Sequence, residues 1–252
     1  MVCPRSKSRP HQTAQSGQNR LYFWWLEQIH HSTNPLQERM TLFWHNHFTS
    51  SLQTVQWPQL MYRQNQLLRT HALGNFADLL HAIWGDPAML IYLDGSKNPL
   101  RKPNENFARE LLELFTLGEG HYSEADIVSA ARAFTGWRYA VRRDEVEFVP
   151  KQHDNGNKQF LGRAGNFGAE DIINILLEQP RTAEFIAEKF WRHFINPGQP
   201  RHDVIVQWAK VFRESDYQVA ALLRQVVASQ PFWDQRNGGH SSSRQSSSRW
   251  VC

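Results

Sequence analysis

The sequence predicts an all-α protein: a multi-helix, bundle-like domain around a central buried helix at about residues 103–118, with a small β-hairpin excursion at about residues 137–161. Three observations lead to this fold class. Apolar residues recur at helical spacing along most of the chain, capping and helix-breaking residues divide that pattern, and short extended runs replace it between 137 and 161. With 252 residues, 40% of them hydrophobic, the chain is large enough to bury a core.

The two ends of the chain differ from its middle. Residues 1–19 are polar and basic, and residues 235–252 are rich in Ser, Arg and Gly. Because neither stretch has apolar periodicity, we expect a disordered basic arm and a disordered tail, with a single helical domain at residues 20–234 between them. Cys3 and Cys252 fall in these end stretches and so indicate neither a disulfide framework nor a catalytic thiol.

The positive charge also lies at the ends. Residues 1–20 hold four basic residues and no acid, and residues 235–252 hold three and none, so the formal net charge of +4 leaves −3 for the residues between. Proteins that bind nucleic acid carry basic charge on their folded surface, so this distribution argues against such a partner. No apolar run approaches the roughly 18 residues of a membrane span, and no secretory signal is visible.

Five helical segments precede the central helix. Leu21, Trp24 and Ile29 have helical spacing, and Asn34-Pro35 then restarts the chain. A capping residue before proline, as in Asp86-Pro87, is typical of a helix start. The predicted segments are residues 21–29, 36–47, 58–73, 76–84 and 87–93.

The central stretch has both a strong helical pattern and many polar groups. Phe107, Leu111 and Leu114 form an apolar stripe, which predicts that this side is buried, and Asn104 or Asn106 can cap the start. Its other face carries Glu105, Arg109, Glu110 and Glu113.

The charges on this helix do not balance. One arginine cannot neutralise three glutamates, so a buried helix needs further compensation from Arg39 or Arg132, from protonation, or from a bound cation. A salt-bridged ladder of Arg109 with Glu105 and Glu113, four residues to either side, is the simplest structural arrangement.

Beyond the central helix, Ser123 and Asp126 form a capping-box-like start of a helix that ends before Gly136. Short extended runs follow, and the turn-forming stretch His153-Asp-Asn-Gly156 interrupts them, which predicts the β excursion. Helices resume at about residues 169–177, 180–194, 202–213 and 218–228.

Several segments together resemble the bacterial domain of unknown function 1800 family. They are Arg39-Met-Thr-Leu-Phe-Trp-His-Asn-His-Phe48, Asp86-Pro-Ala-Met-Leu90, Asn104-Glu-Asn-Phe-Ala-Arg-Glu-Leu-Leu-Glu-Leu114 with Thr116-Leu-Gly118, Ala133-Phe-Thr-Gly-Trp137, and His153-Asp154. The resemblance covers roughly residues 20–234. It implies no agreed biochemical activity.

Members of that family tend to be longer at both ends, and many look exported. This chain lacks their long N-terminal helical portion and an export signal, and a Ser/Arg-rich tail from about Asn237 stands where further helical sequence is expected. The resemblance therefore implies a chain shortened at both ends, and it leaves the localisation open.

His45 and His47 are the first candidate metal ligands. Side chains two residues apart on a helix point about 200° away from each other, so both can bind one ion only if the helix ends or unwinds between them. His47 shares the apolar face of Met40 and Phe43. The alternative to a metal ligand at this position is a structural histidine, hydrogen-bonded within the core.

Glu110 and Glu113 are the next candidates, because ligands three residues apart on a helix reach the same side of a bundle. His153 and Asp154 lie in a glycine-containing loop, a common place for functional side chains, although Asp154 before Asn155-Gly156 equally suits turn chemistry.

Two functions from different classes remain. The first is a metal-assisted, hydrolase-type enzyme, in which Glu110, Glu113, His153 and Asp154 are catalytic. Its divalent metal, the one cofactor considered, would be bound by His45, His47 and Glu110. The second is a non-catalytic binding or assembly module, in which the same groups belong to a structural network. That network would include Asn104, Glu105, Asn106, Arg109, Arg39 and Arg132.

A protein partner or self-association is expected in the second case, because Trp24 and Trp25 of the 21–29 helix predict uncovered apolar surface.

Overall fold

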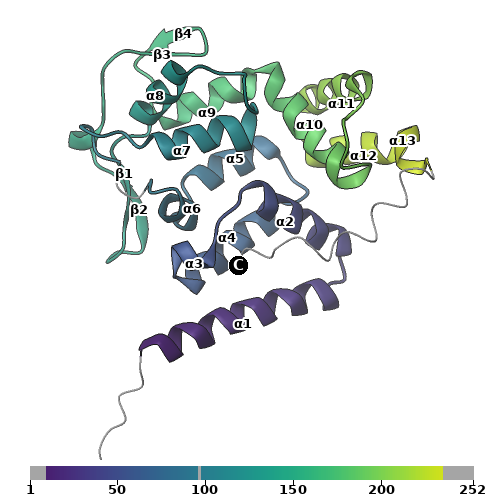
Figure 1. The fold of residues 1–252 in the computed structure, drawn as a ribbon, viewed down its shortest axis with the longest axis horizontal. Coiled ribbons are helices and arrows are strands. Elements are labelled where there is room, and N and C mark those ends of the chain that lie inside the picture. The colour runs from purple at the N-terminus through teal and green to yellow at the C-terminus, as the bar shows by residue number, and fades with distance from the viewer. Residues whose placement is uncertain (1–9, 96–97, 235–252) are drawn as a thin grey trace, which may run out of the picture.

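The computed structural model describes residues 10–95 and 98–234, with the backbone alone for residues 10–16. Most of these residues are helical, and two small antiparallel sheets interrupt the helices (Figure 1). The predicted fold class, mostly α with a small β excursion, is therefore confirmed. Residues 1–9 and 235–252, where disordered ends were predicted, lie outside the described residues.

The first half of the chain forms short helices with local start signals. They are α1 (Pro10–His31), α2 (Pro35–His47), α3 (Leu52–Val55), α4 (Pro58–His71), α5 (Phe76–Trp84) and α6 (Pro87–Tyr92). Three of them begin at an Asn or Asp whose side chain accepts hydrogen bonds from the first-turn amides: Asn34, Asn75 and Asp86.

The second half continues from the central helix. It contains α7 (Glu105–Glu110), the π-helical segment η1 (Leu111–Thr116), α8 (Glu124–Ala133), β1 (Trp137–Ala140), β2 (Glu145–Phe148), the short 3₁₀ turn η2 (Pro150–Gln152), β3 (Lys158–Phe160), β4 (Arg163–Gly165), α9 (Ala169–Glu178), α10 (Pro180–Phe194), α11 (His202–Glu214), α12 (Val219–Ala228) and α13 (Gln230–Trp233).

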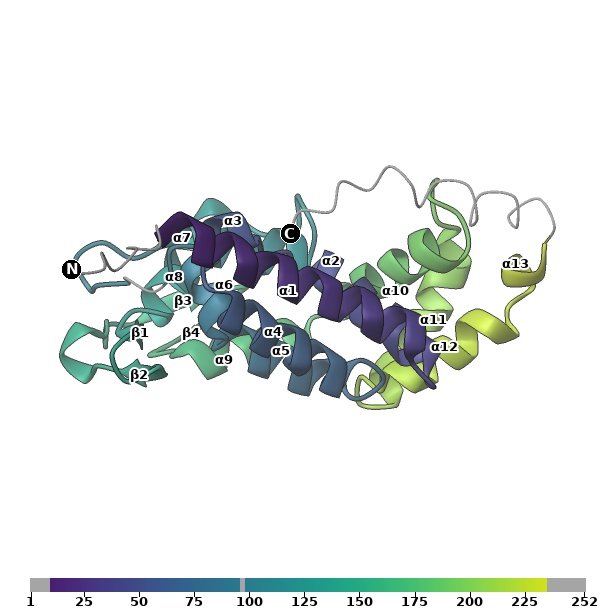
Figure 2. The same ribbon diagram turned by 90° about the horizontal axis from the view of Figure 1, so that it is seen from below.

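Helix α1 begins at Pro10, eleven residues before the predicted segment 21–29. The expectation of a disordered arm through residue 19 is wrong for residues 10–19, which continue the helix of the apolar 21–29 stretch toward the N-terminus. Proline suits the first helical position, and no further proline follows Pro10 in this stretch, so the helix runs through Gly17 without a break. Figures 1 and 2 show α1 along one side of the molecule, where it packs on α2 and α4.

Aromatic side chains from separate helices meet in the core. Trp44 on α2 is fully buried and stacks on Phe48 and on Phe76 of α5. Its indole N–H donates to the backbone oxygen of Ala72 at 3.0 Å, so the buried polar atom is satisfied. This contact joins α2 to the α4–α5 connection.

The central helix is α-helical only in its first part. Asn104 caps it by accepting from the amide of Asn106, and from Leu111 onward the hydrogen bonds widen to the π pattern. The Leu117 amide donates to the Leu112 oxygen at 2.8 Å, five residues back, and the Thr116 hydroxyl donates to the oxygen of Leu111 at 2.6 Å. The wider turn changes which residues face the core.

Leu114 shows the effect of this change. The predicted stripe placed Leu114 in the core, but 42% of it is exposed, whereas Leu112, Phe115 and Thr116 are buried. The prediction was wrong because it used 3.6 residues per turn, and a π segment has more residues per turn, so the buried face shifts in sequence.

The β excursion consists of two hairpins instead of one. Strand β1 pairs with β2, and β3 pairs with β4, so the excursion runs from Trp137 to Gly165. Leu161 and Gly162, with φ of 47° and 80°, form the two-residue turn between β3 and β4. Two consecutive residues with positive φ match the right-handed twist of a tight hairpin.

Helices α10, α11 and α12 pack together at the other end of the molecule from the hairpins (Figure 1). Within residues 10–95 and 98–234, none of the helices combines the length and the apolar character that a membrane crossing requires.

Candidate functional site

His47 is a buried histidine that joins α2 to the π-helical segment. It is 6% exposed, and its Nε2 is 3.1 Å from the backbone oxygen of Phe115. Burial, and then the Lys189 ammonium, lower the pKa of His47 to about 3, so its ring is neutral. A neutral ring that donates from Nε2 leaves Nδ1 as an acceptor, and this buried atom has no hydrogen-bond partner among the described residues.

His45 lies in a different environment. Its ring packs edge to face on Trp25 of α1, with 4.8 Å between the ring centres. Burial lowers the pKa of His45 to about 4. The two histidines therefore face separate helices, as their spacing on α2 requires.

The charged groups of the central helix pair with α8 and the loop before it. Both Arg109 Nη atoms donate to the carboxylate of Glu124, at 2.9 and 2.8 Å, and the Tyr122 hydroxyl donates to Glu113 Oε2 at 2.7 Å. The predicted ladder of Arg109 with Glu105 and Glu113 is wrong, because a carboxylate on the helix packed alongside meets both arms of the guanidinium.

Arg39 and Arg132 do not neutralise the central helix either. The Arg39 guanidinium lies over the ring of Phe194 on α10, 5.6 Å from its centre, and Arg132 binds Asp154. The prediction failed because it assumed a fully buried charged face. Glu105 is exposed, and Glu110 and Glu113 are only partly buried, so water solvates them.

His153 and Asp154 hold the loop after η2 against the end of α8. Asp154 accepts from Arg132 Nε at 2.7 Å and Nη2 at 3.2 Å, and this contact lowers the pKa of Asp154 to about 2. The Asp154 amide donates to Thr135 Oγ1 at 2.8 Å, and His153 Nδ1 is 2.9 Å from the Thr135 oxygen. Gly156 lies so close to the Arg132 guanidinium that a Cβ at this position would be 2.8 Å from Arg132 Nη2.

Lys158 is the member of this cluster that the sequence analysis missed. The residue is almost completely buried on β3, and its ammonium donates to the backbone oxygens of Asp154 and Gly156, at 2.6 and 3.1 Å, and to Asn166 Oδ1 at 3.2 Å. A lone lysine in a polar loop predicts exposure, so nothing in the sequence pattern marked it.

A pocket of about 410 Å³ opens beside the central helix, between it, the end of α2 and the end of α6. Its walls include Thr49, Tyr92, Asn106, Glu110, Leu114 and Phe115. Partial burial, and then the nearby Glu113, raise the pKa of Glu110, while Arg109 opposes the shift. Of the predicted site residues, Glu110 and Asn106 are the two that this pocket brings together.

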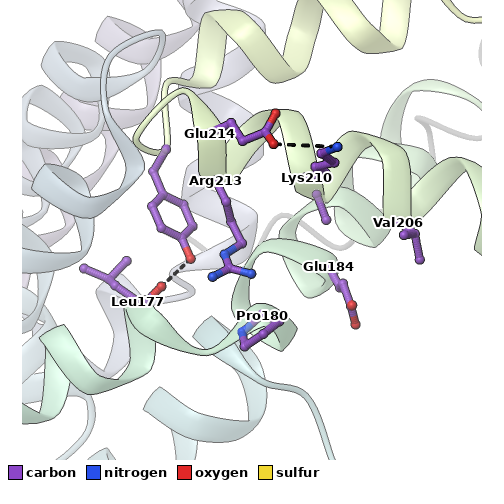
Figure 3. A pocket seen from close by; sticks show the side chains of 9 residues that line it. Leu177, Pro180, Glu184, Val206, Lys210, Arg213 and Glu214 are labelled. Carbon is purple, nitrogen blue, oxygen red and sulfur yellow. Dashed lines mark hydrogen bonds and ion pairs between the residues drawn. The ribbon is translucent and has the colours of Figure 1, made fainter.

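A second pocket, of about 570 Å³, lies where α11 meets the α9–α10 connection (Figure 3). Figure 3 shows the Arg213 guanidinium pointing toward Pro180, while Lys210 lies 3.8 Å from Glu214. Two acidic and two basic side chains line this pocket, the fourth being Glu184, so its charge does not favour a ligand of either sign.

The six residues predicted to converge on one pocket lie in separate environments. His47 contacts η1, His45 contacts α1, Glu113 binds Tyr122, and the His153–Asp154 pair binds the end of α8. Across the described part of the chain, no group of three or more His, Cys, Asp or Glu side chains is placed to hold a metal ion. The prediction that these six residues converge on one pocket is therefore wrong. A metal or catalytic role for any one of them stays a prediction.

Comparison with known proteins identifies a family for this chain. No curated protein and no solved structure is similar enough to match this chain. A family model described as "Protein of unknown function (DUF1800)" matches residues 5–245, nearly the whole chain and including all the motifs on which the resemblance depended. That description names no activity, so the function of the chain is uncharacterised. Because the match covers nearly the whole chain, the chain belongs to the DUF1800 family.

Proposed function

We propose that the chain is a non-catalytic assembly module that binds a second copy of itself through the outer face of α1. The observation that carries this proposal is the exposure of four large apolar side chains on that face: Tyr22, Phe23, Leu26 and Ile29. Phe23 alone is 61% exposed. A single exposed apolar residue needs no explanation, but a group of them on one helix is typical of a binding surface.

The inner face of the same helix is already covered. Trp25 is buried, the Trp24 ring packs on Tyr62 with 4.7 Å between the ring centres, and the Arg69 guanidinium lies over Trp24. The outer residues therefore cannot turn inward without breaking these contacts. Their exposure therefore follows from the way α1 packs on α2 and α4.

The polar groups predicted to be catalytic also favour this class of function. Asp154, His153 and Glu113 each take a partner that joins two elements of the fold. Such contacts fix the positions of helices and loops and leave no shared reaction centre. The metal-assisted hydrolase is the weaker alternative for that reason.

A second copy is the partner that the charges of α1 fit. Arg20 and Glu27 are exposed and seven residues apart, so they lie on the same flank of the helix, while Tyr22 and Ile29 lie on the opposite flank. In an antiparallel pair around a two-fold axis, each flank meets the same flank of the other copy. Arg20 of each copy then lies opposite Glu27 of the other, and Phe23 and Leu26 fill the space between.

The pairing is expected to be weak. Four side chains per copy provide less than the roughly 800 Å² per partner of a standard interface, so we expect dissociation constants above about 1 µM.

A charge exchange tests this arrangement. We expect sedimentation equilibrium to show a monomer–dimer equilibrium that weakens about fivefold in Arg20→Glu and in Glu27→Arg, because each puts like charges opposite each other twice. The double variant restores the original charge pairs in reverse and should recover the association. Phe23→Ser should weaken it more than tenfold.

Trp233→Ser is the matched control, because Trp233 on α13 is also an exposed aromatic residue. Its association should equal that of the unchanged protein. A chain that stays monomeric at every concentration, or a double variant as weak as the single ones, would rule out this pairing.

A further inference from the structure

The pocket beside the central helix contains a negative charge without a partner. Among the described residues, no hydrogen bond or ion pair engages the Glu110 carboxylate, and no lysine or arginine is among the residues that line the pocket. Glu113 adds a second carboxylate close by, and its effect together with partial burial outweighs that of the nearby Arg109, so the pKa of Glu110 is raised. The pocket therefore attracts a cation.

The polar atoms of the lining are mostly acceptors. The Thr49 hydroxyl donates to the backbone oxygen of Asn46 at 2.9 Å, and the Asn106 amide nitrogen is 3.5 Å from the oxygen of Leu93. These contacts occupy donors of both side chains and leave the Thr49 hydroxyl oxygen and the Asn106 Oδ1 to accept. Together with the Glu110 carboxylate they supply three oxygen acceptors, the number of N–H donors that a primary ammonium group carries.

The other walls are apolar or aromatic. Leu114 and Tyr92 line the pocket, and so does Phe115, whose ring also packs on Phe48 in the core. Leu114 reaches the pocket because the π-helical turn moves this side chain out of the core. One carboxylate and two neutral groups would leave most positions of a hard metal ion to water, whereas apolar and aromatic walls suit an organic body or a cation over a ring.

We propose that this pocket binds a primary ammonium ion with an apolar or aromatic body. The ammonium group contacts Glu110, Asn106 and Thr49, and the body lies against Leu114, Phe115 and Tyr92. A volume of about 410 Å³ is within the range of small-molecule sites. None of the residues that line this pocket belongs to α1, so ligand binding here does not require assembly.

The test uses phenethylammonium as the probe and the full chain as the protein. We expect saturable binding by calorimetry and by amide chemical-shift changes confined to the pocket walls. Glu110→Gln should weaken it at least tenfold, because the amide keeps the shape and removes the charge. Glu105→Gln, on the exposed side of the same helix, is the matched control and should bind as the unchanged protein does.

Two further probes separate the alternatives. The uncharged analogue 2-phenylethanol should bind at least tenfold more weakly; equal binding, together with an unaffected Glu110→Gln variant, would mean an apolar slot and overturn the proposal. Mn²⁺ that broadens the Glu110 signals and is not displaced by phenethylammonium would mean a metal site instead. Absence of saturable phenethylammonium binding would also overturn it. Repeating the titration in Phe23→Ser keeps the result independent of self-association.

Discussion

The free energy of unfolding should fall by about 3 kcal/mol for each pH unit between about pH 5.5 and pH 4.5. Three largely buried histidines cause the fall. The pKa of His47 is lowered to about 3, and those of His45 and His193 to about 4, all from 6.5 and in each case mainly by burial. In this range the folded chain keeps the three rings neutral, while the unfolded chain protonates them.

One buried carboxyl opposes the histidines. Burial raises the pKa of Asp86 from 3.8 to about 6, so in this range the folded chain holds a proton there that the unfolded chain releases. The unfolded chain thus binds about two protons more than the folded chain, and each proton contributes about 1.4 kcal/mol per pH unit. Stability present at neutral pH is therefore lost as the pH falls below 6.5.

Denaturant titrations at a series of pH values measure this slope. His47→Gln should halve it, because one of the two net protons disappears, and the glutamine amide can still donate to the oxygen of Phe115. His202→Gln on α11 is the matched control, since His202 is exposed, and should leave the slope unchanged. Stability that stays constant from pH 7 to pH 4.5 would contradict the proposed neutrality of the buried rings.

The helix starts were predictable because their signals are local. Asn34-Pro35, Asp86-Pro87 and the Ser123–Asp126 capping box each specify a start through hydrogen bonds within one turn. A short stretch of sequence holds all the residues that such a signal needs. These three predicted starts therefore lie close to the observed ones, whereas that of α1 does not.

The π-helical segment was not predictable in the same way. The sequence of residues 111–116 is compatible with the wider hydrogen bonds of a π-helix, but it is equally compatible with an α-helix. At 3.6 residues per turn the same residues also give an apolar stripe, so the pattern does not distinguish the two. The Phe115 oxygen is bonded by His47, which comes from a helix 68 residues away in the chain. Only the packed structure brings that partner into place.

The candidate site was only partly predictable for a related reason. Glu110 and Asn106 were identified from the polarity of the central helix, and both line the pocket. The partner of Arg109 was not, because three carboxylates lie within four residues of it in sequence, yet Glu124 of α8 makes the contact. The choice among acceptors depends on helix packing, which residue spacing does not encode.

Lys158→Met should lower the free energy of unfolding by about 3 kcal/mol. The methionine keeps much of the side chain's volume but cannot donate, so two backbone oxygens and Asn166 Oδ1 lose their donor. Each buried acceptor left unpaired costs about 1–3 kcal/mol, and removing a buried charge offsets part of the sum.

The effect should begin in the loop that Lys158 holds. Hydrogen exchange at residues 154–166 should accelerate in Lys158→Met before the helices are affected, because the ammonium connects the Asp154 turn to the residues after β4. Lys151→Met, at an exposed lysine of the same excursion, is the matched control and should change stability by less than about 0.5 kcal/mol. If both variants were equally stable, the buried ammonium would not hold the loop, and the contacts of Asp154 with Arg132 and Thr135 would suffice to keep it in place.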